Sequence, residues 1–356
     1  MKQTFIIAEA GVNHNGDVDL AYSLVEAASK AGADAVKFQT FKADKLVNKN
    51  AAKAEYQKRS TDAAESQYDM LKRLELSEEA HFLLAEKCRA LGIMFLSTPF
   101  DLESLIFLNS RLRVQKIKFS SGDITNGPLL LEAAKTGKPI ILSTGMSTLG
   151  EIEDALAVLA YGYTNSQEPP SKEAFYAAYG SSEAQELLKE KVTLLHCTTE
   201  YPAPFDEVNL RCILTLRDSF GLRTGFSDHT EGIAVPVAAA ALGVDVIEKH
   251  FTLDRSLPGP DHKASLEPDE LELMIRSIRQ VELAMGIRAK RPTPSERKNI
   301  RIARKSLYAL EDIGEGQTIL PEQVTVKRPG DGRSPMDYWE LTGKLAQRTY
   351  RKDDHL

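Results

Sequence analysis

Short apolar runs alternate with longer amphipathic stretches along residues 1–286 of the chain. The runs are rich in β-branched residues and have the length of strands, whereas the stretches between them repeat apolar positions at helical spacing. The predicted strands are Phe5–Gly11, Ala35–Thr40, Met94–Pro99, Gln115–Ser121, Pro139–Gly145, Val192–Thr199, Thr224–Thr230 and Val246–Phe251, and helices are predicted at Leu20–Ala31, Glu78–Leu91, Leu129–Thr136, Glu151–Ala160, Val235–Leu242 and Asp269–Gly286. Glycines directly after several of these helices are typical helix stop signals.

This regular alternation of strand and helix over residues 1–286 predicts a (β/α)8 TIM barrel. An open, doubly wound sheet is the alternative, but no GxGxxG motif follows the first strand. Residues 287–304 are rich in Lys, Arg, Pro and Ser, which indicates a linker. Residues 305–356 contain short β-like pieces separated by turns and predict a small β-rich domain. A segment this short can form only a small hydrophobic core. We therefore expect it to pack against the barrel or against another subunit.

Two stretches interrupt the alternation. Phe41–Leu74 follows the second predicted strand on the side where barrel active sites lie, and it predicts either a lid or substrate wall, or a tolerated surface insertion. Tyr163–Lys191 falls on the opposite side of the barrel. We interpret that second insertion as structural or as a contact surface.

Polar residues gather at the carboxyl ends of the predicted strands, where TIM barrels build their active sites. The predicted pocket contains Glu9, Asn13, His14, Lys37, Gln39, Ser97, Thr98, Lys118, Ser120, Ser121, Asp123, Ser143, Thr144, His196, Thr198, Thr199, Tyr201, Ser227, His229, Glu248 and His250. Burying so many unpaired polar groups is costly, so their presence favours a polar, anionic ligand.

Two lysines and several hydroxyls in this set suit the binding of a phosphate and a carboxylate. Lys37 and Lys118 supply positive charge, and the hydroxyl donors are Thr98, Ser121, Ser143 and Ser227. An alternative interpretation is that one lysine only forms a structural salt bridge with Glu9 or Glu248.

His229 and His250 each close a predicted strand, and one short helix separates the two strands. Strands in such a unit run parallel and usually lie side by side, about 5 Å apart. Both imidazoles are therefore expected at the same sheet edge, where they can share a divalent metal with positions left for water and substrate. Imidazole and oxygen ligands favour Mn²⁺, with Mg²⁺ or Co²⁺ as alternatives.

Composition narrows the function classes. The chain has 45 basic and 51 acidic residues, a net charge of −6, and no basic stripe of the kind that nucleic acid needs. Its three cysteines follow no CxxC spacing, which favours a reduced, cytoplasmic location. No apolar run is long enough to cross a membrane, and the start of the chain lacks the features of a signal peptide.

The motifs together resemble those of the sialic acid synthase family, the bacterial N-acetylneuraminate synthases. The resemblance rests on Ala8–Gly16 (AEAGVNHNG), Val36–Thr40 (VKFQT), Ser97–Phe100 (STPF), Leu142–Met146 (LSTGM), His196–Thr198 (HCT), Phe226–His229 (FSDH), Glu248–Thr252 (EKHFT) and Pro258–His262 (PGPDH). The tail sequence Val326–Gly330 (VKRPG) is similar to the antifreeze-like (SAF) domain of these enzymes.

The resemblance implies a metal-dependent condensation of phosphoenolpyruvate with N-acetylmannosamine and water, which gives N-acetylneuraminate and phosphate. A synthase for a related sugar, legionaminic or pseudaminic acid, is the alternative with the same chemistry. The non-family alternatives are a Schiff-base aldolase that uses Lys37 or Lys118, and a scaffold protein without activity.

Residue roles also follow from the resemblance. Lys37, Thr98, Lys118, Ser121, Ser143 and Ser227 would hold phosphoenolpyruvate; Glu9, Tyr201 and Asp261 would face the sugar; Gln39 and Thr199 would complete the substrate-binding set; and His229 and His250 would bind the metal. Glu9 is a candidate acid or base. Asp123 stands where many members have a catalytic glutamate, and Arg328 would reach a partner's barrel in a domain-swapped homodimer.

Overall fold

The computed structural model describes residues 3–54, 61, 65–164 and 168–356. They form two compact units, Met1–Gly286 and Ile287–Leu356, which are described separately below. Small parts of both predicted insertions (residues 55–60, 62–64 and 165–167) lie outside the described residues.

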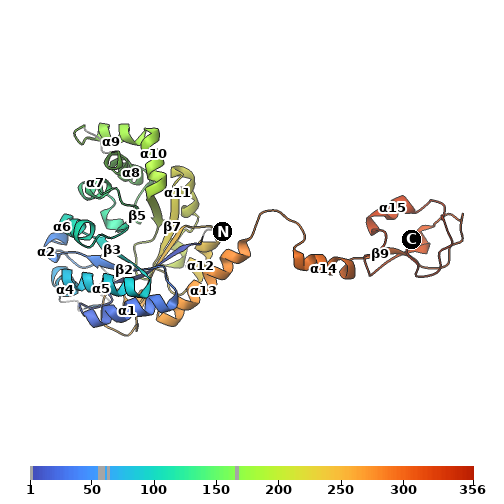
Figure 1. Cartoon of the computed structure of the whole chain (residues 1–356), viewed down its shortest axis with the longest axis horizontal. Coiled ribbons are helices and arrows are strands. Elements are labelled where there is room, and N and C mark those ends of the chain that lie inside the picture. The colour runs from blue at the N-terminus through green and yellow to red at the C-terminus, as the bar shows by residue number, and fades with distance from the viewer. Residues whose placement is uncertain (1–2, 55–60, 62–64, 165–167) are drawn as a thin grey trace. The chain divides into compact units, whose positions relative to one another are not determined.

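The first unit is a barrel of parallel strands, as predicted (Figure 1). Its strands are β1 (Phe5–Gly11), β2 (Ala35–Thr40), β3 (Met94–Pro99), β4 (Ile117–Phe119), β5 (Ile140–Ser143), β6 (Val192–His196), β7 (Arg223–Asp228) and β8 (Val246–His250). Hydrogen bonding joins the 8 strands in the order β3-β2-β1-β8-β7-β6-β5-β4. The terminal strands of that order, β3 and β4, also contact each other, so the sheet curls into a nearly closed TIM barrel.

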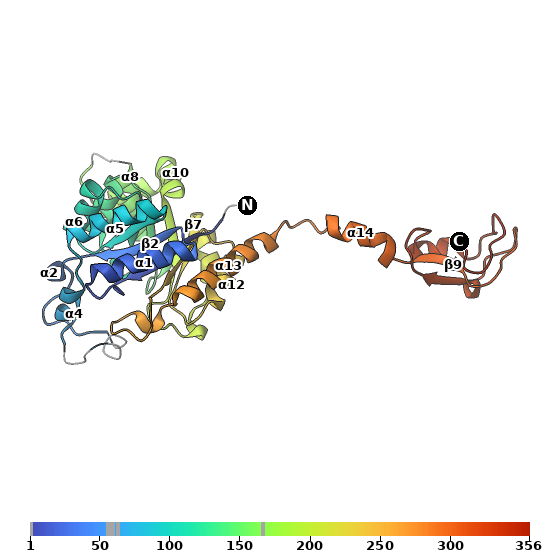
Figure 2. The same ribbon diagram turned by 60° about the horizontal axis from the view of Figure 1, so that its bottom comes forward.

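Helices surround the strands on the outside of the barrel (Figure 2). They are α1 (Val18–Ala31), α2 (Ala43–Leu46), α4 (Gln67–Leu74), α5 (Glu78–Leu91), α6 (Leu102–Ile106), α7 (Gly127–Lys135), α8 (Leu149–Tyr163), α9 (Lys172–Tyr179), α10 (Ser182–Lys191), α11 (Cys212–Phe220), α12 (Ala234–Ala241) and α13 (Pro268–Met285). Local signals set their ends. In α1, for example, the Asp17 side chain caps the first turn and Gly32 adopts the left-handed conformation that ends the helix.

The barrel interior changes from apolar to polar along each strand. One buried cluster contains Ile7, Ala35, Leu96, Ile141, Leu195 and Val246, all on different strands. Two residues further along the chain stand Glu9, Lys37, Thr98, Ser143 and Glu248, with Cys197 directly after the end of β6. Because successive side chains of a strand point to opposite faces, a step of two residues keeps these polar groups inside the barrel. An apolar layer therefore forms the floor beneath a polar one.

The later strands are shorter than predicted. The ladder of β4 ends at Phe119, and a tight turn over Ser121–Asp123 follows, where the sequence pattern predicted strand up to Ser121. Similarly, β6 ends at His196 rather than at Thr199. Polar residues beyond the end of each hydrogen-bonded strand therefore lie in loops. Their side chains need not follow the alternation between the inside and the outside of the barrel.

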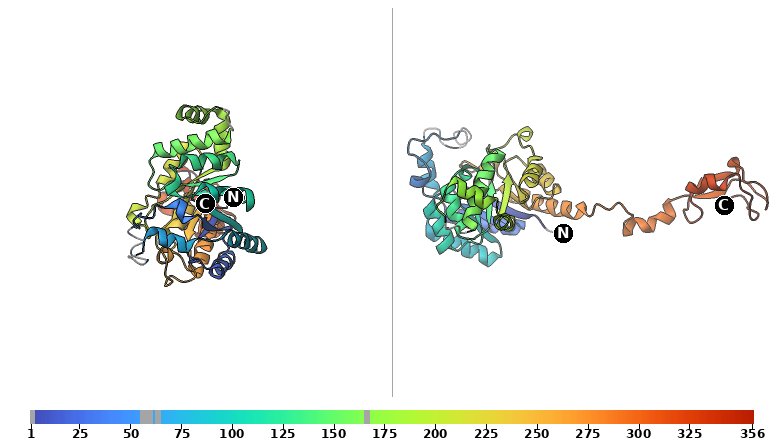
Figure 3. Two further views of the ribbon diagram at one scale, coloured as in Figure 1. Left: turned by 90° about the vertical axis from the view of Figure 1, so that its left-hand side faces the viewer. Right: turned by 90° about the horizontal axis from the view of Figure 1, so that it is seen from above.

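The two insertions form helices. The described part of the first insertion contains α2 and α4, which follow β2 in the chain and contact each other. The second contains α9 and α10, which both pack against α8 on one side of the barrel (Figure 3).

The second unit has a small core of its own, contributed by Leu307, Ala309, Ile313, Ile319, Leu341, Ala346 and Leu356. Its elements are α14 (Pro294–Ala303), an antiparallel pair β9 (Ser306–Ala309) and β10 (Val324–Lys327), and α15 (Tyr338–Leu341). Helix α14 occupies part of the stretch predicted as linker. A capping box between Thr293 and Glu296, with Pro294 at the first helical position, starts it, and this signal was present in the sequence.

Candidate active site

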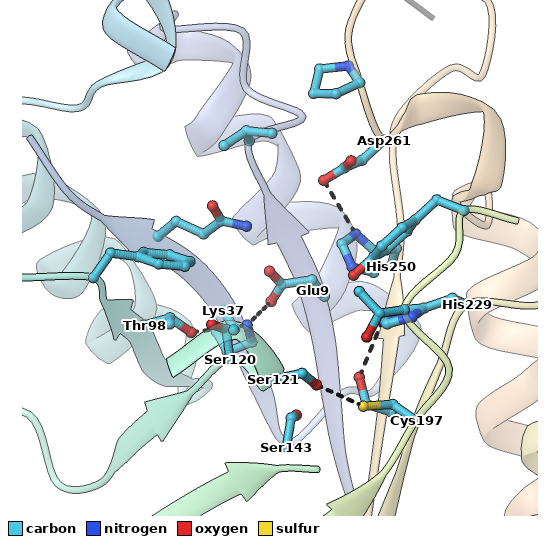
Figure 4. A pocket seen from close by; sticks show the side chains of 18 of the residues that line it. Glu9, Lys37, Thr98, Ser120, Ser121, Ser143, Cys197, His229, His250 and Asp261 are labelled. Carbon is cyan, nitrogen blue, oxygen red and sulfur yellow. Dashed lines mark hydrogen bonds and ion pairs between the residues drawn. The ribbon is translucent and has the colours of Figure 1, made fainter. Parts of the chain in front are cut away.

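A cavity of about 400 Å³ opens at the carboxyl ends of the barrel strands (Figure 4). Fifteen of the residues expected at the site line it: Glu9, Lys37, Gln39, Thr98, Lys118, Ser120, Ser121, Ser143, Thr199, Tyr201, Ser227, His229, Glu248, His250 and Asp261. They come from strands or loops that are far apart in sequence. The barrel closure therefore brings the predicted set together in one place.

Two lysines and two glutamates form a buried ionic network in this cavity. Lys37 Nζ lies 2.7 Å from Glu9 Oε2, 3.6 Å from Glu248 Oε2 and 3.2 Å from Thr98 Oγ1. Lys118 Nζ lies 3.4 Å from Glu248 Oε1 and donates to Ser143 Oγ at 2.8 Å. Both lysines thus form the salt bridges that the sequence left open as an alternative, and they also border the cavity, where an anion can reach them.

The two glutamates and two lysines of this network differ in the direction in which their pKa values are shifted. Burial raises the pKa of Glu9 to about 7, assisted by the nearby Glu248 and opposed by Lys37. Burial also disfavours ionised Glu248, but Lys118, Lys37 and the Ser227 hydroxyl outweigh it and lower its pKa. Burial similarly lowers the pKa of Lys118, whereas in Lys37 the two carboxylates outweigh burial and raise it. Glu9 is therefore the carboxyl that can exchange a proton near neutral pH.

His229 and His250 lie beside each other, with ring centroids 5.4 Å apart. The ring of Tyr201 lies 4.1 Å from that of His229, centroid to centroid. Burial lowers the pKa of His229 to about 4 and that of His250 well below its ordinary value, so both imidazoles are neutral at pH 7. In its neutral form His229 donates from Nδ1 to the Thr198 carbonyl at 2.5 Å. This leaves Nε2, 3.5 Å from Ser227 Oγ, unprotonated and able to act as a ligand.

These two imidazoles fit a divalent ion only in part. No group of three or more His, Cys, Asp or Glu side chains within the described ranges has metal-binding geometry. However, His250 Nδ1 is buried without a hydrogen-bond partner in the described structure, and Asp261 Oδ2 lies 3.8 Å from it. A neutral, unpartnered imidazole beside a second one suits a metal whose remaining ligands are water and substrate.

A second buried ion pair fixes the strand ends that carry the histidines. Asp228 and Lys249 are register partners on β7 and β8, each one residue before a histidine, and both are fully buried. Lys249 Nζ donates to Asp228 Oδ2 at 2.6 Å and also to the Thr230 carbonyl. The pair therefore ties together the two strand ends and the loop that carries His229.

Substitution of this lysine is expected to destabilise the barrel. In Lys249→Met the Asp228 carboxylate stays buried without its partner, which costs about 3–5 kcal/mol of unfolding free energy. Chemical denaturation measures the loss. The double variant Asp228→Asn with Lys249→Met removes both charges and should recover most of it; equal losses in the single and double variants would contradict an ionic role.

Some predicted site residues lie outside the cavity wall. Asp123 is buried, and its carboxylate accepts a hydrogen bond from Ser120 Oγ at 2.6 Å, so Ser120 rather than Asp123 lines the cavity. Asn13 bonds the Phe251 carbonyl and Ser265, and His14 accepts from Gly16 N. A direct catalytic role of Asp123 stays a prediction. Arg328 is exposed on the second unit, and its reach into a partner's barrel also stays a prediction.

One wall of the cavity is formed by residues that were not among the predicted site residues. Its residues come from the first insertion: Leu46, Val47, Gln67, Met70, Leu71 and Leu74. Met70 and Leu74 belong to a small apolar cluster with Val12 and Phe41. The helical spacing of Met70, Leu71 and Leu74 indicated that one face of α4 is packed, but the sequence did not show which part of the protein that face covers. The described part of the insertion is thus a cavity wall.

Cys197 also lines the cavity, although the predicted pocket did not include it. The Cys197 thiol lies 3.0 Å from Ser121 Oγ, and burial raises its pKa, which is typical of an unreactive, structural thiol. Glu248 anchors the ionic network described above. None of the helices among the described residues is both long and apolar enough to span a membrane.

Comparison with known proteins identifies close relatives. The model of the NeuB family matches residues 24–290, and the model of the SAF domain matches residues 304–356. An N,N'-diacetyllegionaminic acid synthase of Campylobacter jejuni is 50% identical over 357 residues, covering 99% of each chain. The N-acetylneuraminate-9-phosphate synthase of Homo sapiens is 34% identical, covering 98% of this chain and 90% of that one.

A solved structure supports the fold. The chain is similar to the N-acetylneuraminic acid synthetase of Leptospira borgpetersenii in complex with citrate, with a TM-score of 0.66 and 32% identity. That alignment covers 84% of this chain and 90% of the other. The resemblance of the sequence motifs and of the tail is thereby confirmed at the level of the family and of both domains.

Proposed function

The chain belongs to the NeuB family, and we propose that it condenses phosphoenolpyruvate with an N,N'-diacylated amino-hexose to give an N,N'-diacetyllegionaminic-type acid and phosphate. The main support for this proposal is the 50% sequence identity, over 99% of both chains, to a synthase of that product. The N-acetylneuraminate product expected first is less well supported, because a synthase of its 9-phosphate is only 34% identical. The alternative left open by the sequence is therefore the better reading.

The two lysines support the binding of phosphoenolpyruvate in this proposal. Lys37 and Lys118 both pair with Glu248 and would bring two positive charges to a substrate with a phosphate and a carboxylate. Hydroxyls of Thr98 and Ser143, already bonded to these lysines, add donors. Such charge-assisted bonds are stronger than neutral ones and orient the substrate for attack.

The sugar aldehyde would lie at the histidine pair. His229 and His250 would hold a divalent ion, and the imidazole and oxygen donors favour Mn²⁺. When bound, the ion would supply Lewis-acid polarisation of the aldehyde. C3 of phosphoenolpyruvate then forms a bond to the aldehyde carbon. The aldehyde oxygen takes up a proton, and C2 of phosphoenolpyruvate is left with cationic character.

Glu9 is the proposed proton carrier. Its pKa of about 7 lets the protonated carboxyl donate to the sugar oxygen, after which the carboxylate can accept a proton from water. That water adds its oxygen to C2. The tetrahedral intermediate then expels phosphate, so the two substrates and one water yield one sugar acid and one phosphate.

The test is a phosphate-release assay with phosphoenolpyruvate, Mn²⁺ and a panel of amino-hexoses, followed by mass analysis of the product. We expect turnover with a 2,4-diacetamido sugar and stronger turnover than with N-acetylmannosamine. Absence of phosphate release with every sugar would contradict the proposal. Borohydride trapping of pyruvate on Lys37 or Lys118, without a metal requirement, would instead favour the Schiff-base alternative.

A further inference from the structure

The insertion wall differs in chemistry from the rest of the cavity. The strand ends present the ionic network, the hydroxyls and the imidazoles, whereas the wall presents Leu46, Val47, Leu71 and the more deeply buried Met70 and Leu74. Leu46, Val47 and Leu71 are only half-buried, so part of their apolar surface remains available. A substrate that fills the cavity therefore meets apolar surface on one side.

One polar side chain interrupts this apolar surface. Gln67, the first residue of α4, lines the cavity within one turn of Met70 and Leu71. Its carboxamide carries both donors and an acceptor. A carboxamide on the same wall as apolar side chains matches an acylamino group, which has an N–H, a carbonyl oxygen and an apolar methyl.

We propose that the insertion wall is the specificity-determining subsite that binds the 4-acylamino group of the sugar, which N-acetylmannosamine lacks. Leu46, Val47 and Leu71 contact the acyl methyl, and Gln67 bonds the amide. This inference rests on the proposed function, since it assumes that an amino-hexose occupies the cavity. It explains the choice between sugars of the same reaction class, because the reacting atoms lie at the network and the histidines, away from the acyl group.

A hydroxylated hexose would be a poorer ligand of this wall. A hydroxyl placed against leucine side chains loses its bonds to water and gains no partner there. Apolar pockets discriminate between substrates that differ by such a group by about 10-fold to 100-fold. The wall therefore selects by both attraction of the acyl methyl and exclusion of hydroxyls.

The variants Leu71→Asn and Gln67→Leu test the inference by kcat/KM measurements with saturating phosphoenolpyruvate and Mn²⁺. Three sugars are compared: 2,4-diacetamido-2,4,6-trideoxymannose, its analogue with a free 4-amino group, and N-acetylmannosamine. We expect each variant to lower kcat/KM for the diacetamido sugar by about 10-fold or more, and to leave that for N-acetylmannosamine nearly unchanged. Leu83→Asn, an exposed position on α5 that does not line the cavity, is the matched control and should change neither value.

Equal losses with all three sugars in folded variants would overturn the inference, as would a wild-type protein that turns over the free-amine analogue as well as the diacetamido sugar. If Leu71→Asn does not fold, Val47→Thr, which keeps the side-chain shape, carries the same test. Wild-type protein that releases no phosphate with any sugar would overturn the proposed function itself, which separates the two failures.

Discussion

Replacement of either cavity histidine by alanine is expected to lower kcat by about 1,000-fold, because polarisation of the aldehyde contributes several kcal/mol and each 1.36 kcal/mol is a factor of ten. His229 and His250 are neutral, buried and adjacent, so each variant removes half of the protein ligands proposed for the ion. The effect is measured by phosphate release across a Mn²⁺ titration.

Binding of Mn²⁺, followed by electron paramagnetic resonance, supplies a readout that does not depend on turnover. His229→Ala and His250→Ala should both weaken it strongly, whereas His196→Ala is the control. His196 bonds the Val208 carbonyl and lies outside the lining of the cavity, so its loss should leave Mn²⁺ affinity unchanged. Full Mn²⁺ binding in both cavity variants would rule out the two-histidine site.

Glu9→Gln is expected to lower kcat by about 100-fold to 10,000-fold, the range that general acid–base groups contribute. The glutamine keeps the size of the side chain but carries no titratable proton. In the wild-type protein the acid form of Glu9 is present below its pKa of about 7 and is lost as pH rises through that value. Activity that needs this acid should therefore fall on the alkaline side of pH 7.

The pH profile distinguishes a proton carrier from a structural carboxyl. In Glu9→Gln the fall of activity at alkaline pH (the alkaline limb of the profile) should disappear together with most of the rate. Glu9→Asp stays ionisable and should keep an alkaline limb, at a shifted pH. An unchanged limb in Glu9→Gln would assign it to another group, of which Asp261, with a pKa raised to about 6 by burial, is the nearest alternative in the cavity.

Much of the site followed from strand periodicity. A step of two residues from Ile7 to Glu9, or from Leu96 to Thr98, keeps a side chain inside the barrel, and eight strands in one order bring their ends together. The adjacency of His229 and His250 followed in the same way from one short helix between two parallel strands. These inferences worked because they depend only on local pattern and on the geometry common to all such barrels.

Asp123 shows where this reasoning ends. It stands just beyond β4, so its position at the strand end placed it at the pocket, but the tight turn over Ser121–Asp123 directs its carboxylate to Ser120. Likewise, the charged composition of residues 287–304 suggested a linker, whereas a capping box starts helix α14 there. In both cases the direction of the chain is set by a few hydrogen bonds, which composition and periodicity do not report.

The sequence by itself therefore determined the barrel, its small second domain and most of the residues that line the cavity, because hydrophobic period and residue type are local properties. Only the tertiary structure decided which carboxylate pairs with which lysine, and thus that Glu9 rather than Glu248 titrates near neutral pH. It also decided that the described part of the first insertion forms a largely apolar cavity wall. Both depend on distances between residues remote in sequence, and electrostatic and packing energies are set by those distances.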